Sequence, residues 1–375
     1  MRSVAIITSI AFSVANFRGA LIRRMVDRGI KVYALAPDYD EETRAAVRAL
    51  GADPVDISLE RTGLRPARDM ADMVRLAATL RRLRPDLVFG YFIKPVIYGT
   101  LAARLAGVRR RYALVAGLGY VFTPDGSGDT TKRRALRSVA SALYRVAFRL
   151  CDRVFLQNGD DLEVLCGRSM LPRDKAVLIS GSGVDLARFQ PGPPVVAPVT
   201  FVLVARLLRE KGIIEYVEAA RRIRESGSDA RFLLVGDVDS NPGGLKRKEV
   251  ERWVAQGVIE WPGQVPDVRP WLAQSSVFVL PSYREGKPRS TQEAMAMALP
   301  VVTSNAPGCR DTVEEGVTGF KVPVRDDRAL EAAMRRFIDD PGLIARMGQA
   351  GRALAERVFD VHRINDAMLG AMGLD

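Results

Sequence analysis

The feature that most limits the possible fold is an alternation of strand-like and helix-like segments that occurs twice along the 375 residues. In the first half, short apolar runs such as 4–8 and Leu87–Tyr91 alternate with segments of helical spacing such as 68–84. The same order returns in the second half, with the runs Thr200–Val204 and Val277–Leu280. Such alternation is typical of parallel, doubly wound sheets. The sequence therefore predicts an α/β chain with two such units.

The segment 191–198 contains four prolines and separates the two alternating stretches. We interpret it as a domain boundary, because Pro-rich segments interrupt both helices and strands. The predicted domains are 1–192 and 193–358, each Rossmann-like, and the last helix, within 359–375, is expected to pack back on the first domain. Ligands of doubly wound sheets bind beyond the carboxyl ends of the strands, so we expect a cleft between the domains.

Several classes of protein are excluded by what the sequence lacks. His362 is the single histidine, so a Ser-His-Asp hydrolase or a multi-histidine metal site is excluded. Cys151, Cys166 and Cys309 form no CxxC pair and indicate a reducing compartment. There is no GxxxxGK[ST] motif and no GxGxxG motif after the first strand, which argues against an NTPase or a dehydrogenase. The first residues are interpreted as a buried strand, not a signal peptide, so a cytoplasmic location is expected.

The positive charge of the chain is concentrated in its first half. Residues 1–195 hold 31 Lys and Arg against 19 Asp and Glu, and the net charge of the whole chain is +12. The second half is therefore neutral. This asymmetry predicts that the first half attracts an anionic partner such as a membrane surface, while an Arg-rich composition without such a role remains an alternative.

A basic amphipathic stretch, residues 132–149, has two possible interpretations. Leu136, Val139, Ala140, Leu143 and Val146 share one helical face. That face is suited to lie on an anionic bilayer, and it is equally suited to cover the sheet of the first domain.

The segment 285–293 follows the predicted strand Val277–Leu280 and opens a helix near Ser290. A helix N-terminus beyond a strand end offers free N–H groups to a phosphate. Gly286 permits close backbone approach, Glu285 can accept hydrogen bonds from sugar hydroxyls, and Glu293 from a ribose. The structural alternative is a capping box, with Ser290 as the N-cap and Glu293 at the third helical position.

Two cations and two carboxylates follow other strands of the second half. Arg206 and Lys211 lie after the strand Thr200–Val204, where a guanidinium and an ammonium suit a diphosphate, although solvated basic residues are an alternative. Asp237 and Asp239 match an Asp-x-Asp metal motif, but a plain turn is the favoured interpretation, so no metal site is predicted.

Together these residues resemble the retaining family 4 glycosyltransferases of the GT-B fold. The resemblance covers the second half almost continuously. It is carried by Arg206 and Lys211-Gly212, Leu234-Val-Gly236, Pro281-Ser-Tyr-Arg-Glu285-Gly286, Glu293-Ala-Met, Leu299-Pro-Val-Val, Gly308-Cys-Arg310 and Gly319-Phe-Lys-Val-Pro323. The first half is similar to enzymes that extend undecaprenyl-diphosphate-linked saccharides. That similarity is carried by Asn16-Phe-Arg18, Ile93-Lys94-Pro95, Tyr98-Gly99, Gly117-Leu-Gly119 and Gly181-Ser-Gly-Val-Asp185.

The resemblance implies a role for each of these residues. Arg206 and Lys211 would neutralise the nucleotide diphosphate, Glu285 would bind the donor sugar and Glu293 the ribose. The donor would also meet Gly286, Lys287, Pro288 and the segment 263–267, which contains Val265. On the acceptor side the resemblance implies Ser13, Phe17, Lys94 and Gly117. Such enzymes need neither a metal nor another cofactor.

The chain departs from the pattern of the family at two positions. Many relatives carry a histidine near the reacting sugar, where this chain has Ala116-Gly117. A general base is then missing, although the leaving diphosphate can take the acceptor proton in front-side transfer. Residue 287 is usually apolar in the family and is Lys287 here, which would contact the diphosphate or alter the choice of donor.

The predicted function is transfer of a sugar from a UDP-sugar, a UDP-N-acetylhexosamine, to a lipid-diphosphate-linked acceptor at the inner face of the membrane. A nucleotide-sugar epimerase is the alternative, but acid/base groups for it are scarce. A nucleic-acid-binding module is a third possibility. The Arg clusters lack interleaved aromatic residues, so no nucleic-acid partner is predicted.

Overall fold

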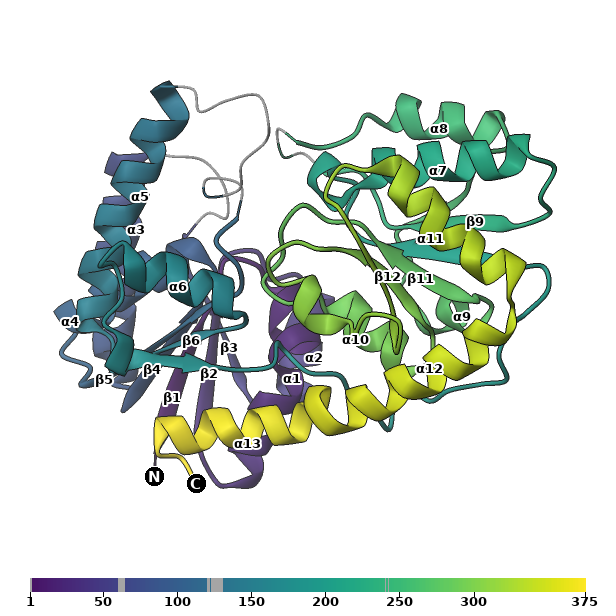
Figure 1. Ribbon diagram of the computed structural model, residues 1–375. Helices are drawn as coiled ribbons and strands as arrows, with labels where there is room; N and C mark the ends of the chain where they lie inside the picture. Colours follow the sequence, from purple (N-terminus) through teal and green to yellow (C-terminus); the bar gives the residue numbers. More distant parts are fainter. Residues whose placement is uncertain (1, 60–64, 120–121, 123–130, 240, 242) are drawn as a thin grey trace. The chain divides into compact units, whose positions relative to one another are not determined.

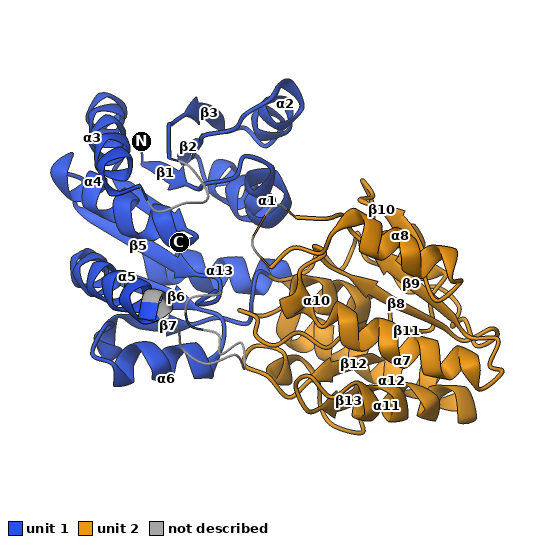
Figure 2. Ribbon diagram, turned by 90° about the horizontal axis from the view of Figure 1, so that it is seen from above, with its two compact units in different colours: residues 1–182, 361–375 blue, residues 183–360 orange. Residues whose placement is uncertain are grey.

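The computed structural model describes residues 2–59, 65–119, 122, 131–239, 241 and 243–375 (Figure 1). The chain divides into unit 1, Met1–Ser182 with Val361–Asp375, and unit 2, Gly183–Asp360 (Figure 2). The expected boundary at residue 192 lies inside unit 2, because Val184 and Phe189 are already buried in the core of that unit. The chain returns to unit 1 after Asp360, two residues after the expected end of the second domain at residue 358. The reason is that Phe359 also packs in the core of unit 2.

Unit 1 is built on a parallel sheet with the strand order β3-β2-β1-β4-β5-β6-β7. Its central strands are apolar on both faces, as the two-sided cover of a parallel sheet requires. In β1, Ile6 pairs with Ala34 of β2 on one side and with Phe89 of β4 on the other. The strands are β1 Ser3–Ile7, β2 Lys31–Ala36, β3 Asp53–Asp56, β4 Leu87–Tyr91, β5 Arg110–Val115, β6 Arg153–Leu156 and β7 Ala176–Leu178.

Helices cover both faces of this sheet. On one face, α1 packs against α13, whose Met368, Leu369 and Met372 are buried in the same core cluster as β1, β2 and β4. On the other face, α3, α4 and α5 lie side by side. The helices are α1 Phe12–Asp27, α2 Glu41–Ala49, α3 Pro66–Leu83, a π-helical turn Pro95–Gly99, α4 Thr100–Leu105, α5 Thr131–Leu150, α6 Gly159–Gly167, a 3₁₀ turn Arg173–Lys175 and α13 Val361–Met372.

Unit 2 repeats the architecture with a parallel sheet of order β10-β9-β8-β11-β12-β13 over one continuous core. Its strands are β8 Thr200–Val204, β9 Arg231–Val235, β10 Glu260–Gly263, β11 Val277–Leu280, β12 Val301–Ser304 and β13 Gly319–Val322. Its helices are α7 Ile213–Glu225, α8 Arg247–Ala255, α9 Arg269–Ala273, α10 Arg289–Ala296, α11 Asp327–Asp339, α12 Gly342–Leu354 and the π-helical turn Ala355–Phe359. Two 3₁₀ turns, Arg209–Lys211 and Arg310–Thr312, complete the unit.

Helix α5 contains the basic stretch 132–149, which was expected either to cover the sheet or to lie on a bilayer. The face that packs into unit 1 is formed by Ala140, Tyr144 and Phe148, whereas Val139 and Val146 of the predicted apolar face are exposed. The helix therefore covers the sheet and also presents apolar side chains outward. Within the described part of the chain, no helix combines the length and apolarity needed to cross a bilayer.

Candidate active site

The predicted donor residues gather at one edge of the unit 2 sheet. Strands β8 and β11 are neighbours, with Phe201 paired to Val277 and Val202 paired to Phe278. The strand order reverses between these two strands. Such a reversal opens a crevice at the carboxyl ends of the strands, which is where doubly wound sheets bind their ligands. The turn with Arg206 and Lys211 follows β8, and the loop 281–288 follows β11, so both begin at that point.

Glu285 and Lys211 form the centre of this edge. The Nζ of Lys211 lies 2.5 Å from Oε1 of Glu285, and both side chains are largely buried. The Ser282 hydroxyl donates to the same oxygen at 2.8 Å. The loop after β11 is thereby fixed to the turn after β8. The carboxylate of Glu285 therefore joins the two turns through one of its oxygens.

Arg206 extends from the same turn as Lys211 and is about half exposed. Its Nη1 donates to Oδ2 of Asp239 at 2.7 Å. Asp237 is in turn paired with Arg247 at 2.7 Å. Both carboxylates of the Asp-x-Asp segment thus accept from guanidinium groups.

The capping-box interpretation of the segment 285–293 was wrong. Helix α10 begins at Arg289, its N-cap is Pro288, and no side chain caps it. Ser290 lies inside the first turn, because Pro288 already supplies the extended backbone that precedes the helix. Instead of reaching back to Ser290, Glu293 accepts from Nε of Arg289 at 2.8 Å. Burial raises the pKa of Glu293, and Arg289 opposes that shift.

The remaining predicted donor residues differ in their surroundings. Gly286 is buried, and Lys287 and Pro288 complete the loop that leads into α10. Opposite them runs the chain at Gly308, where a Cβ atom would lie 2.3 Å from the carbonyl oxygen of Glu285 and 2.5 Å from that of Gly286. Val265 lies between β10 and α9, half-buried against the core of unit 2.

The four predicted acceptor residues belong to unit 1, and two of them follow its own central strands. Ser13 follows β1 and is buried, with its hydroxyl 2.8 Å from that of Tyr91. Lys94 follows β4 and is buried in an ion pair, 2.7 Å from Oδ1 of Asp69. Both polar groups are therefore engaged inside the unit. Phe17 is partly exposed on α1, and Gly117, after β5, has a φ of +108°.

Sequence reasoning missed the contacts that hold the donor loop in place. Tyr283 donates to Glu215 of α7 at 2.6 Å, and Glu285 receives the Ser282 hydroxyl bond described above. Gly308 was noted only as part of a resemblance. Its being a glycine after an apolar strand was the sequence signal, since glycine permits close backbone approach. The structure shows that approach, with a φ of +77° at Gly308.

Two family models match the chain. The one described as Glycosyltransferase Family 4 matches residues 15–188, and the one described as Glycosyl transferases group 1 matches residues 198–340. The chain belongs to the family 4 glycosyltransferases. The first match falls almost entirely on unit 1 of this transferase and the second on unit 2. Its identity as a glycosyltransferase confirms the sequence prediction, and the epimerase alternative receives no support.

Curated relatives extend over most of the transferase. N,N'-diacetylbacillosaminyl-diphospho-undecaprenol alpha-1,3-N-acetylgalactosaminyltransferase of Campylobacter jejuni is 27% identical over 88% of each chain. UDP-Gal:alpha-D-GlcNAc-diphosphoundecaprenol alpha-1,3-galactosyltransferase of Escherichia coli is also 27% identical, over 73% of this chain and 71% of the relative.

Solved structures confirm the GT-B fold. HepE of Anabaena, in complex with UDP and glucose, matches with a TM-score of 0.78 and 16% identity over the whole of both chains. Sucrose-phosphate synthase of Thermosynechococcus elongatus matches with a TM-score of 0.80 and 19% identity, over 98% of this chain and 97% of that one. At such identities the likeness concerns the fold.

Proposed function

We propose that this transferase moves an N-acetylhexosamine from its UDP-linked form to a polyprenyl-diphosphate-linked saccharide, with retention at the anomeric carbon. The observation that carries the proposal is the set of Arg206, Lys211, Glu285 and Glu293 around the carboxyl ends of β8 and β11. The names of two relatives with lipid-diphosphate acceptors support the acceptor class.

The charges of the site suit departure of a nucleoside diphosphate. In the proposed mechanism, Arg206 and Lys211 stabilise the negative charge that develops on the diphosphate as the glycosidic bond breaks. Each exchanges part of its contact with Asp239 or Glu285 for phosphate oxygens. Glu285 orients the sugar through its hydroxyls, and Glu293 orients the ribose. Val265 and its neighbours cover the base.

No histidine lies in the described part of unit 1 outside α13, which carries His362. We therefore assign the removal of the acceptor proton to an oxygen of the leaving diphosphate. The proton moves from the acceptor hydroxyl to that oxygen while the new glycosidic bond forms on the same face of the sugar. No metal is assigned to the site, which is in keeping with the pairing of Asp237 and Asp239 to arginines.

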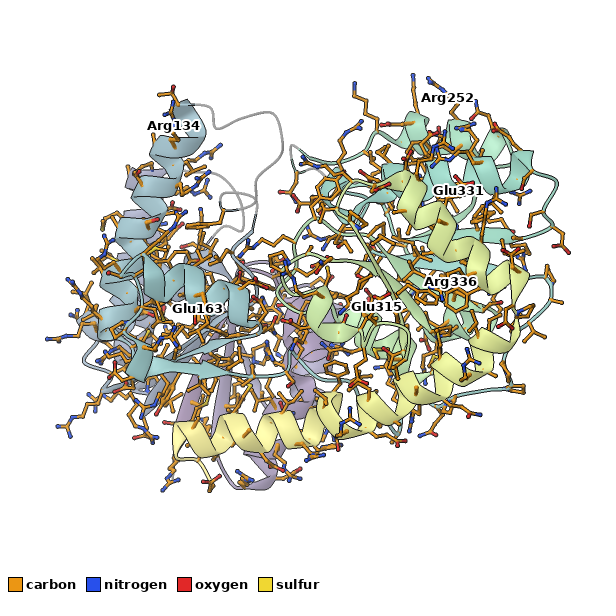
Figure 3. All side chains as sticks on the ribbon, in the orientation of Figure 1. Arg134, Glu163, Arg252, Glu315, Glu331 and Arg336 are labelled. Atoms are coloured by element: carbon orange, nitrogen blue, oxygen red, sulfur yellow. The ribbon has the colours of Figure 1, made fainter. Side chains whose placement is uncertain are left out.

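The acceptor is a lipid, and we propose that the transferase meets it at the inner face of the plasma membrane through α3, α4 and α5 of unit 1. The two acids of α3, Asp69 and Asp72, are buried, and α4 and α5 contain none. Apart from the neutral Thr131 and Ser138, the exposed side chains of this layer are basic or apolar, with Arg134 at the start of α5 (Figure 3). The exposed apolar residues are Met70, Val74, Leu105, Val139 and Val146. Such a face attracts anionic lipid headgroups.

The transfer reaction is tested with a panel of nucleotide-sugars and short polyprenyl-diphosphate saccharides, with products read by mass spectrometry. We expect a product from a UDP-sugar, and we expect Arg206→Ala and Lys211→Ala each to lower kcat at least a hundredfold. Arg252→Ala, an exposed residue of α8, is the control and should leave turnover unchanged (Figure 3). Near wild-type rates in both site variants would contradict the assignment.

Membrane docking is tested by flotation with vesicles. The protein should float with vesicles containing anionic lipid and remain below with zwitterionic ones. Arg134→Glu combined with Val139→Asp should abolish flotation, whereas Arg252→Glu should not. Equal flotation of all three proteins would refute the assignment of the α3–α5 face.

A further inference from the structure

Lys287 is a cation of the donor loop that the proposed mechanism does not use. It lies between Glu285 and the first residue of α10, and its side chain is half-buried. Among the residues that the structure describes, its ammonium group has neither an ion-pair nor a hydrogen-bond partner. Asp311 exerts an electrostatic attraction on it without forming an ion pair.

Three other cations of the donor edge differ from Lys287 because each forms an ion pair. Lys211 is paired with Glu285, Arg206 with Asp239 and Arg289 with Glu293. The ammonium of Lys287 loses part of its hydration and gains no ion pair in return. Burial accordingly lowers the pKa of this group. A partly desolvated charge without a partner is unfavourable by itself. It is stabilised when a ligand brings the opposite charge, and such groups are found at functional sites for that reason.

The position of Lys287 limits which anion it meets. The proposed mechanism already assigns Arg206 and Lys211 to the diphosphate of the donor. Lys287 lies two residues after Glu285, which is the residue assigned to the sugar hydroxyls. Resting on the proposed function, we propose that Lys287 selects a donor whose sugar carries a carboxylate, a UDP-linked hexuronic acid. An N-acetylhexosamine oxidised at C6 satisfies both this requirement and the proposed sugar class.

The inference is tested on the full chain by calorimetry and by transfer assays with matched donors. The pairs are UDP-glucose with UDP-glucuronic acid and UDP-N-acetylglucosamine with its C6 uronic acid form, and UDP alone serves as the reference. We expect each acidic donor to bind about ten- to a hundredfold more tightly than its neutral partner, as one charge-assisted contact allows.

Lys287→Met keeps the length of the side chain and removes its charge. It should abolish the preference for acidic donors and leave the affinity for UDP within threefold of wild type, and Lys287→Arg should retain the preference. Lys248→Met, an exposed residue of α8, makes the same change in net charge and should behave as wild type.

Two outcomes would overturn the inference. If Lys287→Met weakens UDP and every donor alike, the ammonium serves the diphosphate. If the wild-type protein transfers neutral sugars with no preference for acidic ones, Lys287 does not select the sugar, and the proposed transfer function survives. Failure of the wild-type protein to bind UDP or any UDP-sugar would instead contradict the proposed function itself.

Discussion

Replacing Gly308 with alanine should damage the donor loop more than it damages the fold. A Cβ atom at this position would lie 2.3 Å from the carbonyl oxygen of Glu285, whereas ordinary contact begins at 3.4 Å. The backbone of the loop must therefore move by about 1 Å. The new residue must also hold a φ of +77°, which costs an alanine about 1–2 kcal/mol.

A displacement of about 1 Å at a catalytic loop lowers turnover about a hundredfold. We therefore expect Gly308→Ala to reduce kcat by roughly that factor. The backbone conformation and the shift together should lower the free energy of unfolding by about 2–4 kcal/mol. Gly316→Ala is the matched control, because Gly316 has a φ of +71° and nothing within 4 Å of its Cβ position.

The two variants are compared by steady-state transfer and by urea unfolding. Gly316→Ala should lose about 1–2 kcal/mol of stability and keep its activity, since it bears the conformational cost alone. Turnover of Gly308→Ala within threefold of wild type would refute the reasoning. So would an equal loss of turnover in both variants, which would trace the effect to stability rather than to the position of Glu285.

Two further predictions concern buried charges. Burial raises the pKa of Glu293, so the proton is bound more tightly in the folded state and the contribution of this group to stability falls as pH rises. Glu293→Gln should therefore raise the melting temperature of the ligand-free protein at neutral pH but not in acid, and weaken UDP binding in calorimetry. Lys94→Met leaves Asp69 buried without its cation and should destabilise unit 1 by about 3–5 kcal/mol in urea unfolding. Adding Asp69→Leu should restore most of that loss, and no restoration would contradict the pairing.

The central strands were predictable because they are buried on both faces and are therefore continuously apolar. Leu87–Tyr91, Thr200–Val204 and Val277–Leu280 have the predicted bounds. The edge strands were missed: β3 has the sequence DPVD and β10 has EWPG, and neither is fully buried. A strand exposed along one side needs no apolar run, so its sequence resembles a turn.

The helix starts show a similar limit. The start of α1 at Phe12 was not predictable, because its N-cap Ala11 provides no side-chain signal. The segment before α4 was equally unpredictable, because it forms the π-helical turn Pro95–Gly99. Local sequence carries little trace of such geometry, which depends on tertiary packing.

Within the site, residue types were easier to predict than partners. A carboxylate and a cation after neighbouring strands were evident from the sequence. The pairing of Lys211 with Glu285 depends on the register between β8 and β11, across more than seventy residues of chain. Likewise, the sequence shows the charge of Lys94 but not its partner. Its burial against Asp69 depends on the packing of α3 on the sheet.

Helix α13 gives the chain a consequence for its synthesis on the ribosome. Residues from both ends of the chain complete the core of unit 1, since Met368, Leu369 and Met372 pack with strands that were made first. Unit 2 is continuous in sequence and can fold as soon as it has emerged. Unit 1 is therefore completed only after unit 2 has been synthesised. Until α13 is made, the apolar surface of unit 1 that this helix covers remains exposed to solvent.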